Sequence, residues 1–374
     1  MMNLPTDNNG ETVTESRVNE SHSADNKIEK HNKTSRLRKL YDRRWKKILL
    51  GIISVLIIIV LTAVCTYSIM WNLGKKALLD NTNASIVTPD NSEILVDDDG
   101  TVIYNGEKYI YNESVTSILV MGVDKKEESD YVTGFKGQAD AIFLVVIDTS
   151  TGKTTVVSVS RDIMAEVPVR TKDGAYVGIE THQICTAYAY GDGAEKSCDN
   201  MVTAVSRLMY GIPINSYFCM DWTAITVLND MVGGVTVPAY DSDWNPTGGT
   251  VTLSGQKALD YIQKRNREME DSNGNRMDRQ INYLKAFAEK TIKKMKSDIT
   301  VPLKMYNTLN KYSTNNIDAS RITFLATLFM NGGANISFEK IRGEVVQGEK
   351  FAEMYVDEDA LYNMVLELFY TKQQ

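Results

Sequence analysis

The hydrophobic positions along this chain fall into three patterns, and each pattern predicts a different kind of element. From Ile48 to Val64 almost every residue is apolar, and no charged side chain occurs between Ile48 and Gly74. A helix needs about 20 apolar residues to cross the hydrocarbon core, so we expect a transmembrane span at residues 48–71. Further on, short apolar runs alternate with stripes of helical period, which predicts a mixed α/β domain.

Three apolar runs predict the central strands of that domain. They are Ser117–Val123, Ala141–Ile147 and Thr155–Val159, and a Thr-Gly-Lys turn joins the last two. Their near-continuous hydrophobicity predicts a sheet covered on both faces by helices. The remaining patterns predict helices at 194–210, 224–231, 254–265, 276–297 and 357–370, and short strands at 217–220, 235–238 and 340–344. In the long helix, an apolar stripe of Met277, Ile281, Leu284, Ala288 and Ile292 is expected to face the core.

The chain therefore divides into four expected parts. Residues 1–47 are polar and then strongly basic, which predicts a disordered cytoplasmic tail, with the remainder outside the cell membrane. A linker at 72–112 is expected to carry a small hairpin near the membrane. Residues 113–374 form the extracytoplasmic α/β domain, with its motifs at 115–295 and a C-terminal extension at 299–374. The preceding 47 residues are too long for a typical cleaved signal peptide, so an uncleaved anchor is favoured.

Charge and residue usage exclude several function classes. The net charge is −7 although the tail is basic, so the rest of the chain is acidic and is a poor general binder of nucleic acid. Only His182 lies beyond the tail, which argues against zinc-protease spacing and Ser–His–Asp chemistry. Ser254-Gly-Gln-Lys257 matches the S-x-x-K of penicillin-interacting enzymes, but no K-T-G accompanies it and such a match arises readily by chance.

Acids and arginines gather at the borders of the predicted elements. Asp124 ends one strand, Asp140 begins the next, and Arg161-Asp162 follows the third. Carboxylates at strand ends suit Mg²⁺, and arginines suit phosphate, so together they suggest a metal-assisted pyrophosphate site. Each feature alone has a plainer reading, since a strand-terminal Asp is often a cap residue. Similarly, Arg276, Arg279 and Gln280 share one helix face that could simply be solvated.

The order of these segments closely resembles the LytR–CpsA–Psr family. The matching blocks are Gly122-Val-Asp124, Gln138-Ala-Asp140, Ser160-Arg161-Asp162, Thr186-Ala-Tyr188-Ala-Tyr190-Gly191, Leu228-Asn-Asp230-Met-Val-Gly233-Gly234-Val235, Leu253-Ser-Gly255-Gln-Lys-Ala258-Leu259-Asp-Tyr261-Ile-Gln263-Lys-Arg265 and Asn275-Arg276-Met-Asp-Arg279-Gln280. They occur in the family's order across about residues 115–295, which makes the resemblance highly specific.

The resemblance implies a fold, an activity and a set of roles. Members resembling this chain have a mixed sheet sandwiched by helices, and they transfer undecaprenyl-pyrophosphate-linked glycopolymers such as teichoic acid or capsule onto peptidoglycan. Carried over by position, Asp124 and Asp140 would bind Mg²⁺, and Asp162 would be a supporting acid. The pyrophosphate would be held by Arg161, Arg265, Arg276 and Gln280, with Arg279 alongside. Apolar helices over the sheet would form a slot for the polyprenyl chain.

Two departures from the family pattern bear on activity. Gln138 and Gln263 stand where the family has arginines. Glutamine keeps hydrogen-bonding capacity but loses the charge and the bidentate fork, so the site has two fewer positive charges. A membrane-anchored scaffold that binds lipid-linked glycan but transfers it poorly is therefore the alternative function.

The cysteines lead to a separate prediction. Cys185 and Cys198 lie beyond the span, where disulfides persist, and they flank a Gly191-Asp-Gly193 turn that could bring them together. We expect them to form a disulfide, with Cys219 as a buried thiol. The alternative is that all three are reduced core cysteines.

Overall fold

The computed structural model describes residues 12–80, 94–96, 101–123, 137–171, 173–239, 244, 248–264, 272–332 and 335–373. The chain divides into two units, Met1–Ser68 and Ile69–Gln374. The first unit is built on helix α1 (Thr12–Leu78), whose last ten residues belong to the second unit.

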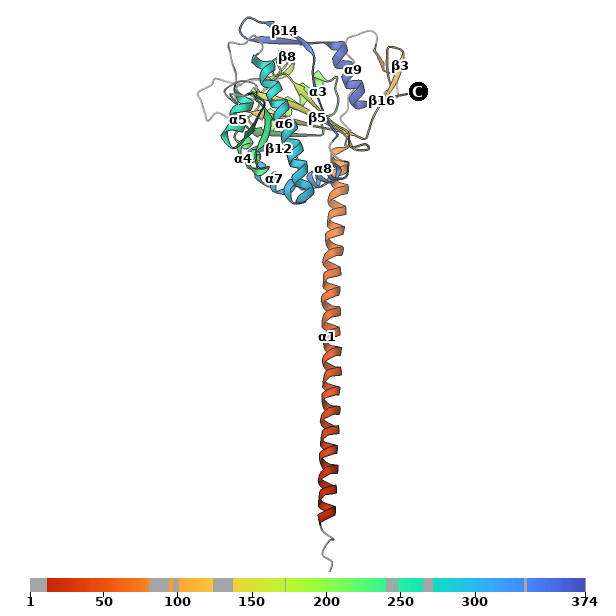
Figure 1. Cartoon of the computed structure of the whole chain (residues 1–374). Coiled ribbons are helices and arrows are strands. Elements are labelled where there is room, and N and C mark those ends of the chain that lie inside the picture. The colour runs from red at the N-terminus through yellow and green to blue at the C-terminus, as the bar shows by residue number, and fades with distance from the viewer. Residues whose placement is uncertain are drawn as a thin grey trace, which may run out of the picture. The chain divides into compact units, whose positions relative to one another are not determined.

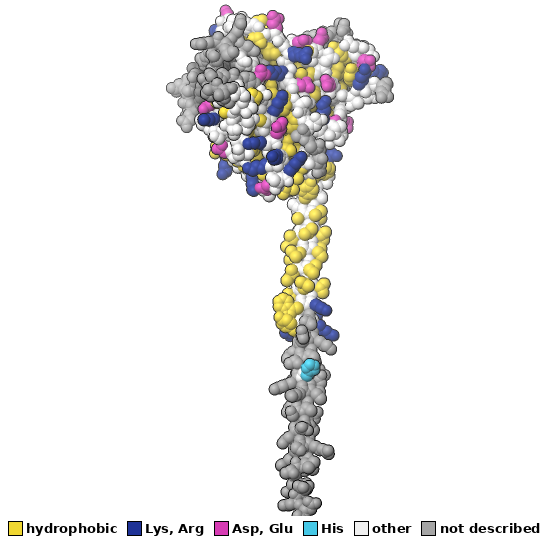
Figure 2. Space-filling view, in the orientation of Figure 1, with side chains coloured by type: hydrophobic (Ala, Val, Ile, Leu, Met, Phe, Trp, Pro, Cys, Tyr) yellow, Lys and Arg dark blue, Asp and Glu magenta, His cyan; other side chains and the backbone are white. Residues whose placement is uncertain are grey.

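Helix α1 carries the long apolar segment. The segment Arg43–Leu78 is long and apolar enough to cross a membrane, by length and composition. Its apolar side chains are exposed, for example Leu50 at 66% and Val60 at 59%, and Figure 2 shows them around the helix. Apolar side chains exposed in this way need a nonaqueous environment, which agrees with the expected span.

A six-stranded mixed sheet organises the second unit (Figure 1). Its order is β12-β9-β4-β5-β6-β13, formed by Ser313–Asn315, Ser216–Asp221, Val115–Val123, Ala139–Asp148, Thr154–Val159 and Ile336–Lys340. The β4-β5-β6 meander is antiparallel, whereas β9 lies parallel to β4 and β13 parallel to β6. The three strands predicted from apolar runs are thus the sheet centre, and every residue of β6 is buried.

Helices cover both faces of this sheet, as the apolar runs predict. On one face, Ile142 and Leu144 pack in a cluster with α3 (Glu195–Leu208) and α9 (Glu358–Phe369). On the other face, Ala141 and Phe143 pack in a cluster with the following helices: α4 (Ala224–Met231), α5 (Gln256–Gln263), α6 (Ser272–Ser297) and α7 (Val301–Leu309). Alternate residues of β5 therefore pack into two hydrophobic cores, one on each face of the sheet. This arrangement confirms the predicted mixed α/β class.

Smaller sheets surround the centre. One has the order β1-β2-β3-β16, from Ile94–Val96, Val102–Tyr104, Glu107–Tyr111 and Tyr370–Lys372, so the expected small hairpin is completed by the C-terminal strand. The others pair β7 (Met164–Arg170) with β8 (Tyr176–Gln183), β10 (Val235–Pro238) with β11 (Thr250–Leu253), and β14 (Gly343–Gln347) with β15 (Ala352–Val356). The remaining helices are α2 (Thr186–Ala189) and α8 (Ala319–Gly332).

Two expectations about elements are corrected. The strand expected at 340–344 is wrong, because β13 ends at Lys340 and β14 begins at Gly343. Only two residues separate β13 from β14, and the two strands belong to different sheets. Their patterns therefore run together in the sequence and look like one strand.

The apolar stripe expected on α6 is only partly buried. Ile281 is buried, but Met277, Leu284, Ala288 and Ile292 are half-buried. The buried positions of the first turns are instead Arg276, Arg279 and Gln280, each 8% exposed or less. The polar face of this helix is therefore not solvated, and its charged groups need partners inside the protein.

Candidate functional site

A β-bulge places Asp140 at the start of β5. In the β4–β5 register Gly122 lies opposite Ala141, but the next residue, Val123, lies opposite Ala139. Asp140 is the residue skipped by this shift. A bulge bends the strand and redirects the side chain of the extra residue, and bulges are frequent beside active sites. The carboxylate of Asp140 is 21% exposed, so it is accessible but largely enclosed.

Arg161 is the centre of the charged cluster. It follows β6, the neighbour of β5, and its Nη1 forms an ion pair with Oδ1 of Asp140. Its Nη2 donates to Oε1 of Gln138 at 2.5 Å, and its Nε lies 3.6 Å from Oδ1 of Asp162. The guanidinium is 16% exposed. These three acceptors fix the orientation of the planar Arg161 guanidinium. A guanidinium held in a fixed orientation is suited to binding an anion through two parallel hydrogen bonds.

Arg276 reaches the same carboxylate from helix α6. Its Nη1 lies 3.9 Å from Oδ1 of Asp140, and its Nη2 donates to the Asp140 carbonyl oxygen at 3.3 Å. The side chain is 8% exposed. The structure thus brings Asp140, Arg161, Asp162 and Arg276 together from segments more than a hundred residues apart.

A small cavity lies at this cluster. Its volume is about 10 Å³, and it is lined by Asp140, Ala141, Ile142, Ser158, Val159, Arg161, Arg276, Met277 and Gln280. This is about the space of one water molecule. The guanidinium groups therefore contact the protein's own carboxylates, and a larger anion requires these side chains to move apart.

Arg279 and Gln280 contact a different partner, the C-terminal end of α5. Arg279 donates from Nε to the Tyr261 carbonyl at 2.8 Å and from Nη2 to the Lys264 carbonyl. Gln280 donates to the Ile262 carbonyl at 3.3 Å while also lining the small cavity. The last carbonyls of a helix lack intrahelical partners, so these side chains cap α5. The expectation that Arg279 lies alongside a pyrophosphate stays a prediction.

Asp162 has a partner that sequence reasoning missed. Gln183, the last residue of β8, donates from Nε2 to Oδ1 of Asp162 at 3.3 Å and to the Ala352 carbonyl at 2.8 Å. The amide thereby ties the acid to strand β15. No motif marks Gln183, because its contact depends on how two peripheral hairpins meet.

Cys185 also lies beside the cluster rather than in a disulfide. It is a buried thiol, and its backbone accepts from the Ala139 N–H and donates to the Arg161 carbonyl, both at 3.4 Å. Burial raises the pKa of the Cys185 thiol, and the Arg161 guanidinium only partly offsets this. The prediction of a Cys185–Cys198 disulfide is therefore wrong in this structure. Cys198 lies in helix α3 near Tyr188 and Cys219, whereas Cys185 faces Arg161.

Two of the expected site residues, Asp124 and Arg265, lie outside the described residues, so the expectation that Asp124 and Asp140 share one metal ion stays a prediction. Among the residues that the structure describes, no group of three or more acid, histidine or cysteine side chains is placed to hold a metal ion. Two hard oxygen donors lie close to Arg161: the carboxylate of Asp140, which lines the small cavity, and the amide oxygen of Gln138.

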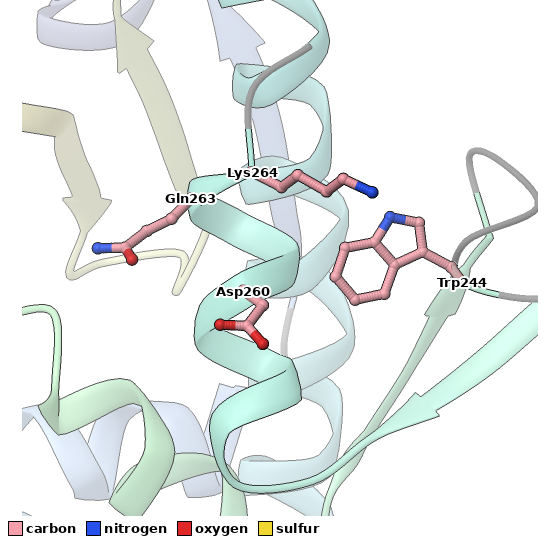
Figure 3. Close-up of a pocket in the computed structure, with 4 residues that line it drawn as sticks. All are labelled: Trp244, Asp260, Gln263 and Lys264. Carbon is pink, nitrogen blue, oxygen red and sulfur yellow. The ribbon is translucent and has the colours of Figure 1, made fainter.

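A second, larger cavity lies on the exposed side of α5. Its volume is about 500 Å³, and Figure 3 shows four described residues that line it, namely Trp244, Asp260, Gln263 and Lys264. Of these four residues, Asp260, Gln263 and Lys264 have polar side chains and Trp244 supplies an aromatic ring. The side chains of the sheet face covered by α4–α7 pack together as a core, and the elongated apolar slot expected for a polyprenyl chain stays a prediction.

The fold and the cluster define an α/β protein with acids and arginines assembled at the edge of a mixed sheet. The model of the LytR_cpsA_psr family matches residues 84–368 of this chain. The chain belongs to the LytR_cpsA_psr family. This confirms the resemblance drawn from the motifs.

Individual relatives agree with this assignment. The polyisoprenyl-teichoic acid–peptidoglycan teichoic acid transferase TagU of Oceanobacillus iheyensis is 25% identical over 324 residues, which are 84% of this chain and 91% of that protein. Biofilm regulatory protein A of Streptococcus mutans is 27% identical over 261 residues, 66% of this chain and 59% of that protein.

Solved structures show the same fold. The TagV structure of B. subtilis has a TM-score of 0.52 at 22% identity, covering 68% of this chain and 95% of that one. A structure of TagT bound to LI-WTA has a TM-score of 0.52 at 19% identity, covering 68% of this chain and 89% of that one. At these identities the likeness establishes the fold alone.

Proposed function

We propose that this chain is a membrane-anchored extracytoplasmic phosphotransferase. It attaches a glycopolymer carried on undecaprenyl pyrophosphate, such as teichoic acid or capsule, to peptidoglycan. The observation that carries the proposal is the convergence of Arg161 and Arg276 on Asp140 beside a cavity. Family membership and the transferase relatives support the same activity.

The proposed reaction moves a phosphoryl group between two oxygens. A hydroxyl of the peptidoglycan sugar attacks the phosphorus that carries the glycan, the bridging P–O bond breaks, and undecaprenyl phosphate leaves. Arg161 and Arg276 are placed to take up negative charge on the phosphoryl oxygens, because their fixed forks present several donors to one anion. Asp162, oriented by Gln183, is the carboxylate to which we assign acceptance of the hydroxyl proton.

The charges of the cluster support a role for Mg²⁺. The guanidinium groups of Arg161 and Arg276 face the carboxylates of Asp140 and Asp162, so their formal charges cancel. A pyrophosphate brings further negative charge that these groups do not neutralise. Mg²⁺ is usually held by one or two carboxylates plus substrate phosphates, and Asp140, with Asp124 as its expected partner, fits that donor set. When bound, the ion would supply charge neutralisation to the pyrophosphate.

The test is transfer of a lipid-linked oligosaccharide to peptidoglycan fragments by the full-length chain, with and without Mg²⁺. We expect Mg²⁺-dependent product, and a loss of about a hundredfold or more in rate for Arg161→Ala and Arg276→Ala. Arg207→Ala is the matched control, because Arg207 is a surface arginine paired with Glu166. Tight binding of the lipid-linked glycan without any transfer would instead favour the scaffold alternative.

A further inference from the structure

Helix α7 lies at the end of the second unit where the apolar span joins it. The last turns of α1, Ile69–Leu78, belong to this unit, and Leu78 shares a hydrophobic cluster with Ile317, just before α8. The Tyr306 hydroxyl of α7 donates to the Ile317 carbonyl at 2.8 Å, which fixes α7 beside that cluster. Figure 1 shows α7 and α8 at this same end of the unit. The surface of α7 is therefore close to the point where the span joins the domain.

Two apolar side chains at α7 point away from the core. Ile299, in the turn before the helix, is 71% exposed, and Leu303, in its first turn, is 49% exposed. Thr300 between them already has helical backbone angles, so positions 299 and 303 lie on one side of the helix start. The opposite side of α7 packs in the core through Val301 and Met305. A single exposed apolar residue is common, but an adjacent pair on a helix that also has a buried apolar side suggests a contact surface.

Lysines surround this apolar pair. Positions 293 to 311 contain five lysines and one acid, a net charge of +4 in a chain whose net charge is −7. The five are Lys293, Lys294, Lys296, Lys304 and Lys311. Lys294 donates to the Met231 carbonyl at the end of α4, whereas Lys296, Lys304 and Lys311 are exposed. Figure 2 shows dark-blue basic side chains gathered over this end of the unit, and the last turn of α1 adds two more lysines.

The acids at this end do not cancel the positive charge. Asp298 pairs with Lys304 at 3.0 Å, and Asp318 pairs with Arg321 at 3.3 Å. Both ion pairs are at the surface, where such pairs contribute little to stability. Lys304 can therefore exchange Asp298 for another anion at small cost, and its side chain is 63% exposed.

A face of this kind fits the surface of an anionic bilayer. Apolar side chains enter the boundary between headgroups and acyl chains, and flexible lysine chains keep their ammonium groups at the lipid phosphates. Each basic residue close to an anionic leaflet adds to the attraction, which falls off within a Debye length. Because α7 packs beside the residues that follow the span, such a surface is within its reach.

We propose that α7 and the turn before it dock on the anionic lipid surface beside the span. Ile299 and Leu303 enter the headgroup region, and Lys296, Lys304 and Lys311 bind lipid phosphates. The inference rests on the membrane anchor of the proposed function and is independent of the transfer step. Docking holds the α/β unit in one orientation on the bilayer, which a single helical anchor alone does not achieve.

The first test measures whether position 303 enters lipid. Leu303→Cys in a full-length chain that also carries Cys65→Ala is labelled with an NBD fluorophore, since the three other thiols are buried. The chain is placed in nanodiscs of phosphatidylglycerol with doxyl-labelled lipid. The matched control is Val345→Cys on β14, an apolar residue that is 63% exposed at the opposite end of the unit in Figure 1. We expect quenching at position 303 to be about threefold or more that at position 345.

The second test measures the contribution of charge. Lys304→Glu combined with Lys311→Glu should lower the quenching at position 303 about threefold, because each reversal replaces attraction to the leaflet by repulsion. Nanodiscs of phosphatidylcholine should lower it similarly. Lys350→Glu is the matched control, because Lys350 is an exposed lysine between β14 and β15, and it should leave the quenching unchanged.

Three results would overturn the docking face. The first is quenching at position 303 no greater than at position 345, and the second is equal quenching in both lipids. The third is protection of position 303 from iodide that grows with chain concentration in detergent, which would assign the face to a second copy of this chain. None of these measurements requires substrate. A chain that docks but transfers no glycan keeps the docking face while the transferase function fails, and transfer without quenching at position 303 removes only the docking face.

Discussion

At the scale of single residues, the charged cluster depends on how Arg161 is oriented. Its fork is shared between Asp140, Gln138 and Asp162, so the glutamine that replaces a family arginine has a definite contact. An arginine at that position would face the Arg161 guanidinium, and the two charges would repel unless an anion lay between them. Gln138 therefore stabilises the orientation of the Arg161 fork.

This predicts opposite effects of charge at position 138. Gln138→Arg should raise the affinity for inorganic pyrophosphate about fivefold, because a positive charge is added a few ångströms from the anion. Gln138→Glu keeps an acceptor for Arg161 but adds a negative charge, so it should weaken pyrophosphate binding. Calorimetric titration of the two variants and the wild type checks this. Equal affinities in all three would show that position 138 does not contact the anion.

A second residue-scale prediction concerns Cys185. Because burial raises the pKa of this thiol in the folded state, the unfolded chain releases its proton at a lower pH than the folded chain. The contribution of Cys185 to stability is therefore fully present below its unfolded pKa of about 8.5 and falls as the pH rises above it. Cys185→Ala should flatten the loss of stability between about pH 8.5 and 10, measured by thermal unfolding at several pH values. An unchanged slope would contradict the expected linkage.

At the scale of elements, the end of α5 and the start of α6 act as one unit. Arg279 is 8% exposed and binds two carbonyls at the end of α5, so its removal leaves buried acceptors without a donor. The family motif around Arg276, Arg279 and Gln280 thus combines residues of two kinds. Arg276 contacts Asp140, whereas Arg279 holds the neighbouring helix in place.

Arg279→Ala should therefore lower the free energy of unfolding by about 2–3 kcal/mol. Arg279→Lys should recover little of it, because a single ammonium group cannot reproduce the two-pronged contact. Thermal unfolding of the detergent-solubilised chain measures the change. The surface variant Arg207→Ala should remain within about 0.5 kcal/mol of wild type. A fall in transfer rate without any loss of stability would instead point to direct anion binding by Arg279.

At the scale of the whole molecule, the last turns of α1 belong to the α/β unit. Leu78 is fully buried, and its carbonyl accepts from the Thr116 hydroxyl at 2.6 Å. Trp71 packs on Phe324 of α8 with ring centroids 5.5 Å apart. The segment that follows the apolar span is thus built into the core beneath the sheet, rather than serving only as a linker.

Truncation tests this attachment. A chain that begins at Ile69 should unfold with the stability of the intact α/β unit. A chain that begins at Asn81 loses Trp71 and Leu78 and should be less stable by about 3 kcal/mol or more, since buried apolar side chains leave a cavity when removed. Denaturant unfolding of the two truncated chains gives the difference directly. Equal stabilities would mean that these side chains contribute nothing to the core.

Local patterns in the sequence predicted most of the elements and indicated the family. Apolar runs predicted β4, β5 and β6, and helical stripes predicted α3, α4, α5, α6 and α9, because burial on both faces or on one stripe leaves a local periodic pattern. The ordered motifs were specific enough to indicate the family and to mark Asp140, Arg161 and Arg276. These inferences need only information carried by neighbouring residues.

The contacts that those residues make became visible in the folded structure. Three features depend on segments that are far apart in the chain. They are the bulge that redirects the Asp140 side chain, the capping of α5 by Arg279 and the contact of Gln183 with Asp162. The disulfide expectation failed for the same reason, since a short sequence separation did not bring the Cys185 and Cys198 thiols together. Periodicity reports which side of an element is buried, but partners and directions are set by packing between elements, which no local pattern contains.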